Sequence, residues 1–226
     1  MQNPPVIVFD LDGTLVDTAP DLIGTLNVIL ARENLPPVPL ESARQVIGGG
    51  ARKLIERGLA LEGRTAAPHD MDRMFRDFIA HYGDNIAVHS RPFDGTIDIL
   101  DDLAARGHAL AICTNKLEWL TRRLLDALSL TERFAFICGA DTFGISKPAP
   151  DGLRQTIEKS GGSAPHAVMI GDSAPDVGAA RALGIPVIGV DFGYTDIPIH
   201  DLNPDIVISH MRDLPNAIGR VSGSQK

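Results

Sequence analysis

The sequence predicts an α/β protein in which a doubly wound parallel sheet carries an inserted all-helical domain. Three observations predict this class. The residues Val6 to Phe9 form an unbroken apolar run, as expected for a strand buried on both faces. From residue 91 onward, strand-like and helical patterns alternate, which is typical of a parallel sheet covered by helices on both faces. Residues 17–88 show successive helical patterns and no convincing strand.

The helical region begins directly after the first strand. Asp17 or Thr18 is placed to cap its first helix, because proline follows within the first turn. Apolar residues at helical spacing predict helices over residues 18–32, 41–46, from 51 onward, and 69–81. We therefore expect a helical cap domain over residues 17–88 and a core formed by residues 1–16 and 89–226.

The core alternates between the two kinds of element. Strands are predicted over residues 6–9, 108–113, 134–138, 166–170, 186–190 and 205–208. Helices are predicted over residues 96–106, 117–128, 150–160, 174–183 and 211–218. The first strand belongs to the same sheet as the later ones, so the helical region is an insertion into a Rossmann-like core.

Composition narrows the function classes. The 226 residues carry a net charge of −8 and contain no basic run, which argues against nucleic-acid binding. No apolar run approaches the length of a membrane span, and no signal-peptide pattern precedes the first strand. The cysteines, Cys113 and Cys138, lie in apolar runs and are expected to be reduced core residues. We expect a cytoplasmic protein that is a monomer or a homodimer, with no membrane partner.

Two acids follow the first strand. Side chains two residues apart on a strand point the same way, so Asp10 and Asp12 converge, and Gly13 lets the chain turn sharply after them. Two such carboxylates repel unless a cation neutralises them or they share a proton. A calcium loop is disfavoured because Thr14 and the residues after it do not supply its further acidic positions. A solvated turn with two chance acids stays open from this stretch alone.

Other polar residues follow later strands. They are Thr114 and Asn115, Lys147 before a proline, and Asp172 with Asp176. Each has a plainer interpretation, as a helix cap, a solvated lysine or acids favoured by a helix dipole. The carboxyl ends of parallel strands, however, lie on one edge of a sheet, so these residues are expected to gather beside Asp10 and Asp12.

These motifs, in this order, resemble those of the haloacid dehalogenase superfamily. The matching stretches are DLDGT, the apolar strand ending in Thr114-Asn115, Lys147-Pro148, and Gly171-Asp172 with Asp176. The helical insertion resembles the C1 cap of that family. The stretches DGTLVDTAPDL and IGGGARKLI, and the GY…PD…I pattern over residues 193–206, resemble its phosphoglycolate phosphatase branch, although related sugar-phosphate phosphatases share much of them.

The resemblance implies a Mg²⁺-dependent hydrolase of a phosphate monoester. Asp10 is then the nucleophile that forms an aspartyl-phosphate, and Asp12 is the general acid and base. The metal ligands are the carboxylates of Asp10 and Asp172 and, by the family pattern, the backbone carbonyl of Asp12. These oxygens suit Mg²⁺ as ligands, and Mn²⁺ also accepts such sites. Family members that lack the acid at position 12 hydrolyse carbon–halogen bonds, so dehalogenation is disfavoured.

The remaining roles follow in the same way. The Thr114 hydroxyl and the Asn115 backbone N–H are expected to bind phosphoryl oxygens. Lys147 is expected to neutralise charge on the phosphoryl group and on Asp10, and Asp176 to support the metal site indirectly.

A glycine-rich loop, Gly48 to Gly50, is the candidate for substrate choice. Gly49 and Gly50 would bring backbone N–H groups near a helix start that favours anions, and Arg52 could hold a substrate carboxylate as a bidentate pair. The alternative is a mobile loop with solvated basic residues. The resemblance to the phosphoglycolate phosphatase branch is what favours 2-phosphoglycolate as the substrate.

Three rival functions were weighed against a phosphatase for 2-phosphoglycolate, and the first of them stays open. The first is another enzyme on the same motifs, either a phosphatase for a sugar phosphate or pyrophosphate, or a phosphosugar mutase. The second is a non-enzymatic phospho-accepting switch, which is disfavoured because Thr114, and no aspartate, ends the second strand. A binding module without activity is disfavoured because every motif position keeps a reactive residue type.

Overall fold

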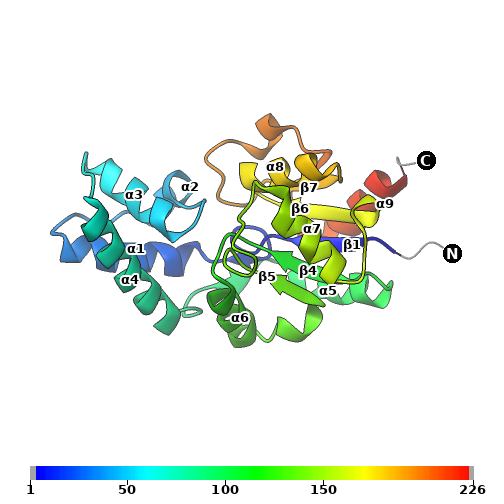
Figure 1. The fold of residues 1–226 in the computed structure, drawn as a ribbon, viewed down its shortest axis with the longest axis horizontal. Helices are drawn as coiled ribbons and strands as arrows, with labels where there is room; N and C mark the ends of the chain where they lie inside the picture. The colour runs from blue at the N-terminus through cyan, green and yellow to red at the C-terminus, as the bar shows by residue number, and fades with distance from the viewer. Residues whose placement is uncertain (1–3, 224–226) are drawn as a thin grey trace.

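The computed structural model describes residues 4–223 and contains a six-stranded parallel sheet. The strands of this sheet are β1 (Val6–Phe9), β4 (Leu110–Cys113), β5 (Phe136–Cys138), β6 (Ala167–Gly171), β7 (Val187–Val190) and β8 (Ile206–Ile208). Their order is β5-β4-β1-β6-β7-β8, so β1 lies inside the sheet and the chain winds outward from it in both directions (Figure 1). The predicted doubly wound α/β class is confirmed.

The two faces of β1 enter different parts of the core. Ile7 and Phe9 belong to one buried apolar cluster, whereas Val6 and Val8 belong to the other. This division follows from the two-residue period of a strand. On the first face pack α5 (Thr96–Ala105), α6 (Glu118–Ala127) and α9 (Leu214–Gly223), and on the second α7 (Pro150–Lys159) and α8 (Ala174–Leu183). Every residue of β1 is buried, which explains its unbroken apolar run.

The first four α-helices of the chain, which lie between residues 19 and 84, form a separate group beside the sheet, on the left in Figure 1. They are α1 (Ala19–Arg32), α2 (Ala43–Val46), α3 (Ala51–Leu61) and α4 (Pro68–Asp84), with a short 3₁₀ helix at Leu40–Ser42. Their buried apolar sides pack on one another, with α1 contacting both α3 and α4. The inserted all-helical region is therefore present, and its boundaries at 17 and 88 stay a prediction.

A two-stranded antiparallel ribbon is present that the sequence pattern did not predict. It joins β2 (Val16–Asp17) to β3 (Arg91–Pro92), with Val16 opposite Pro92. Two residues are too few to show a strand period, so the pattern carries no signal. The ribbon brings the two connections of the helical group side by side.

Most other elements agree with the expected ranges to within a few residues. The predicted helix over 41–46 is a 3₁₀ turn followed by α2, and the last helix begins with a 3₁₀ turn at Met211–Asp213 and continues to Gly223. Cys113 and Cys138 are free and buried, as expected. Within residues 4–223, no helix is long and apolar enough to cross a membrane.

Candidate active site

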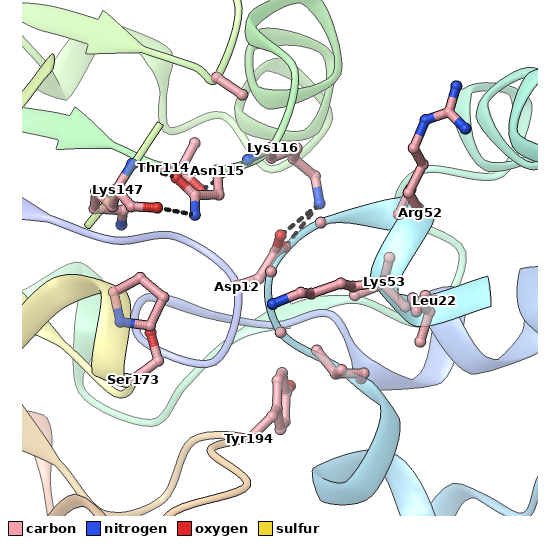
Figure 2. Close-up of a pocket in the computed structure, with 18 of the residues that line it drawn as sticks. Asp12, Leu22, Arg52, Lys53, Thr114, Asn115, Lys116, Lys147, Ser173 and Tyr194 are labelled. Atoms are coloured by element: carbon pink, nitrogen blue, oxygen red, sulfur yellow. Dashed lines mark hydrogen bonds and ion pairs between the residues drawn. The ribbon is translucent and has the colours of Figure 1, made fainter. Parts of the chain in front are cut away.

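A cavity of about 600 Å³ lies where the carboxyl ends of the sheet strands meet the helical group. Its lining combines predicted site residues from the sheet edge with residues of α3, α4 and the loop before α3. The sheet edge supplies Asp10, Asp12, Thr114, Asn115, Lys147 and Asp172, and the helical group supplies Gly49, Gly50 and Arg52. Figure 2 shows these two sides facing each other. The structure thus brings all of these predicted residues around one space.

Three buried carboxylates form the floor of the site. One oxygen each from Asp10, Asp172 and Asp176 lies within 4.8 Å of the others. Asp10 follows β1 and Asp172 follows β6, which are neighbouring strands. Asp176 comes from the first turn of α8, where its Oδ2 accepts hydrogen bonds from the Ser173 backbone N–H (3.1 Å) and hydroxyl (2.6 Å). This capping arrangement holds Asp176 rigidly beside the other two acids.

Lys147 balances part of this charge. Its Nζ lies 2.6 Å from Asp176 Oδ1 and 3.0 Å from Asp10 Oδ1, and the side chain is 2% exposed. Burial disfavours the ammonium, but the charges of Asp10 and Asp176 outweigh it and raise the pKa of Lys147 above its ordinary value. The Asn115 side chain fixes the Lys147 backbone, accepting from its N–H and donating to its carbonyl, each at 2.9 Å.

One lysine cannot neutralise three acids. Burial is the main cause that raises the pKa of Asp10, to about 6, against the opposing charge of Lys147. Burial and the neighbouring acids Asp176 and Asp10 raise the pKa of Asp172 well above its ordinary range. Asp10 Oδ1 is also buried, and apart from its ion pair with Lys147 it has no polar partner among residues 4–223. These oxygen donors and the unmet negative charge fit a hard divalent cation such as Mg²⁺.

Asp172 depends on two glycines for its position. A Cβ on Gly13, whose φ is +81°, would lie 2.5 Å from Asp172 Oδ2, and one on Gly193 would lie 2.3 Å from Asp172 Cβ. Neither separation is possible for real atoms without a shift. The Tyr194 backbone N–H donates to Asp172 Oδ2 at 2.7 Å, so the carboxylate is held between two close backbone segments.

Asp12 is held apart from the other acids. Lys116 Nζ donates to both of its oxygens at 2.8 Å, and the Thr18 hydroxyl donates to Oδ1 at 2.8 Å. Thr18 is the residue before α1, but its side chain makes no capping hydrogen bond, because its hydroxyl donates to Asp12. Lys116 was not among the predicted site residues, although its place directly after Thr114-Asn115 at a strand end was an available signal.

Thr114 ends β4 at the same edge. Its backbone N–H donates to the Cys138 carbonyl at 2.9 Å, which continues the pairing of β4 with β5 beyond the strand. Its hydroxyl accepts from the Lys116 N–H at 3.3 Å. The residue is 4% exposed and lines the cavity.

The loop before α3 closes the cavity from the helical side. Gly48, Gly49 and Gly50 all have positive φ angles, and a Cβ on Gly50 would lie 3.7 Å from the Asn115 carbonyl of the core. Arg52 turns away from Asp12, whereas Lys53 reaches into the cavity (Figure 2). Arg52 pairs with Asp72 at 2.6 Å.

The family follows from comparison with known proteins. The model of the haloacid dehalogenase-like hydrolases matches residues 7–190. The chain belongs to this family. It is 48% identical over 206 residues to a Mesorhizobium japonicum protein named phosphoglycolate phosphatase, covering 91% of each chain. It is 45% identical over 215 residues to a Caulobacter vibrioides protein of the same name, covering 95% of this chain and 91% of the other.

A solved structure of this family has the same fold. A crystal structure described as a "predicted phosphoglycolate phosphatase" from Haemophilus somnus superposes with a TM-score of 0.88 at 30% identity. The match covers 96% of this chain and 99% of the other, so it includes the helical group as well as the sheet. The haloacid dehalogenase-like hydrolase fold expected from the motifs is confirmed.

Proposed function

We propose that this hydrolase cleaves 2-phosphoglycolate to glycolate and phosphate with the help of Mg²⁺. The observation that carries the proposal is the pairing of a buried Asp10, Asp172 and Lys147 group with a separately held Asp12 at one wall of a 600 Å³ cavity. The names of the curated relatives support the same reaction. Phosphoryl transfer needs positioning and dense positive charge, which Lys147 together with a cation held by these acids would supply.

The chemistry takes two steps. An Asp10 carboxylate oxygen attacks phosphorus, the ester P–O bond breaks, and the Asp12 carboxyl gives its proton to the leaving alkoxide. Water then attacks phosphorus of the aspartyl-phosphate while Asp12 takes the proton from that water. The acyl phosphate P–O bond breaks, phosphate leaves, and Asp10 regains its carboxylate.

The metal would be held by the carboxylates of Asp10 and Asp172 and by the Asp12 backbone carbonyl. When bound, Mg²⁺ would supply charge neutralisation at the phosphoryl oxygens. Asp176 positions Lys147, to which it is bound at 2.6 Å, and so keeps the ammonium beside Asp10.

The other predicted residues receive the phosphoryl group and the rest of the substrate. The Thr114 hydroxyl, the Asn115 backbone N–H and Lys147 would contact phosphoryl oxygens, because all three residues line the cavity beside Asp10. Gly49 and Gly50 would offer backbone N–H groups from the opposite wall. The sequence predicted Arg52 as the carboxylate ligand, but in this structure its guanidinium is engaged by Asp72 at 2.6 Å.

The test is phosphate release from a panel of monoesters, with Mg²⁺ and with EDTA. We expect Mg²⁺-dependent release led by 2-phosphoglycolate. Release led by a sugar phosphate or pyrophosphate would overturn the substrate but keep the reaction. Conversion of a bisphosphate-primed sugar phosphate without phosphate release would favour a mutase, and a stable phosphoprotein without turnover would favour a switch.

A further inference from the structure

We propose that Lys116 and Tyr82 bind the substrate carboxylate, and so make this enzyme selective for phosphate esters of short hydroxy acids. The proposal rests on the proposed function, and it names the two residues that would bind the carboxylate end of the substrate. Lys116 comes from the loop after β4, and Tyr82 from α4 of the helical group. Both line the cavity.

Lys116 is built into the site. Its side chain is 5% exposed, and its Nζ donates to both oxygens of Asp12 at 2.8 Å (Figure 2). The ammonium also lies 4.7 Å from the centroid of the Tyr82 ring, a cation–π contact that joins the core to the helical group. An ammonium has three hydrogen-bond donors, so its two bonds to Asp12 leave one donor for another acceptor.

The Tyr82 hydroxyl supplies a second observation. The residue is 1% exposed, and its hydroxyl lies beside the Lys116 ammonium but makes no hydrogen bond of good geometry with it or with any other residue of 4–223. Buried polar groups almost always have a hydrogen-bond partner, so a buried hydroxyl that lines a cavity without one points to a group that binds there. A neutral phenol is a hydrogen-bond donor, and a carboxylate is an acceptor for both this hydroxyl and the Lys116 ammonium.

The short distance between the ester oxygen and the carboxylate of 2-phosphoglycolate also places the carboxylate near Lys116. In 2-phosphoglycolate a single methylene separates the carboxylate from the ester oxygen. Because Asp12 must reach that oxygen to protonate it, the carboxylate comes to rest within a few ångströms of Asp12. Lys116 Nζ, at 2.8 Å from both Asp12 oxygens, is the cation nearest to that position.

The other cations that line the cavity are less suited. Arg52 is paired with Asp72 at 2.6 Å and stacks 4.8 Å over the Phe75 ring. Arg57 donates to the Ile47 carbonyl at 3.1 Å and pairs with Asp196 at 3.0 Å. Lys53 also reaches into the cavity, from the wall opposite the sheet edge, but its side chain is exposed, whereas Lys116 is buried and bound to Asp12.

The experiment compares two esters that differ only at the distal group. They are 2-phosphoglycolate and 2-hydroxyethyl phosphate, in which a neutral hydroxymethyl group replaces the carboxylate. The measured quantity is the ratio of their kcat/KM values with saturating Mg²⁺. This ratio cancels any general damage to Asp12 or to the fold, because such damage slows both esters alike.

Two variants change Lys116 and Tyr82, and a third removes a lysine charge outside the cavity as a control. We expect Lys116→Met to lower the ratio about 10- to 100-fold, as for loss of a hydrogen bond to a charged group, and Tyr82→Phe to lower it about three- to tenfold. Tyr82→Phe removes one oxygen and leaves every contact of Asp12 in place. Lys159→Met, on an exposed part of α7, removes the same charge outside the cavity and should leave the ratio unchanged.

The outcomes separate this proposal from the proposed function. If the wild type cleaves neither ester, or prefers the neutral one, the proposed substrate is wrong. If the wild type prefers 2-phosphoglycolate but Lys116→Met and Tyr82→Phe slow both esters equally, the carboxylate binds elsewhere. A ratio lowered by Arg52→Met alone would assign the carboxylate to Arg52.

Calorimetry covers the case in which Lys116→Met is too slow to assay. In the Mg²⁺-loaded Asp10→Asn background, 2-phosphoglycolate should bind more tightly than 2-hydroxyethyl phosphate. Adding Lys116→Met should bring the two affinities within about twofold of each other. A preference that survives the second substitution would overturn the proposal.

Discussion

At the scale of single residues, the proposed reaction depends first on Asp10, the proposed nucleophile. It is the acid nearest to Lys147 Nζ after Asp176, and it lines the cavity. Asp10→Asn keeps the shape of the side chain but removes the nucleophile, so phosphate release should fall by more than about a thousandfold. Circular dichroism and thermal melting should show an intact fold. Turnover within tenfold of the wild type would disprove the nucleophile.

The titration of Asp10 gives a second prediction at this scale. Its pKa of about 6 lies above the ordinary 3.8, so the folded protein binds this proton more tightly than the unfolded chain. Its contribution to stability therefore falls as pH rises through this window, by about 3 kcal/mol in total. In EDTA, urea unfolding should show Asp10→Asn gaining about that much relative to wild type between pH 4 and pH 7.5. Mg²⁺ should remove most of the difference.

Lys147 carries a stability prediction. Because it is the buried cation between Asp10 and Asp176, Lys147→Met leaves two buried carboxylates without their ion pair. We expect the free energy of unfolding in EDTA to fall by about 3–5 kcal/mol, measured by urea titration at pH 7.5. The control is Lys159→Met on exposed α7, which should change it by less than about 0.5 kcal/mol. Equal effects would mean that the buried pairs contribute nothing.

At the scale of elements, the glycine loop before α3 must keep an unusual backbone. Gly50 has φ +89° and ψ 173°, a conformation that is nearly restricted to glycine. Gly50→Ala should lower stability by about 1–3 kcal/mol and also raise KM for 2-phosphoglycolate, because this loop lines the cavity. Gly63→Ala, at φ +63° in the α3–α4 turn with open space around it, is the matched control. It should lower stability without changing KM.

At the scale of the whole molecule, much of the site could be predicted because a parallel sheet brings its strand ends together. From the residue pattern alone, that rule groups Asp10, Thr114, Lys147 and Asp172, and all four line one cavity. It could not reveal the Lys116–Tyr82 contact, which depends on how α4 packs against the core. Nor could it show that neighbouring side chains at 52 and 53 point in different directions.

The ribbon of β2 and β3 joins the helical group to the sheet through two paired antiparallel strands. The antiparallel pairing of Val16 with Pro92 and of Asp17 with Arg91 holds these two connections together. Thr18 directly follows β2, and its hydroxyl donates to Asp12 Oδ1 at 2.8 Å. A displacement of the helical group would therefore reach Asp12, the proposed proton donor, by two contacts: the Thr18 hydrogen bond and, through Lys116, the Tyr82 ring.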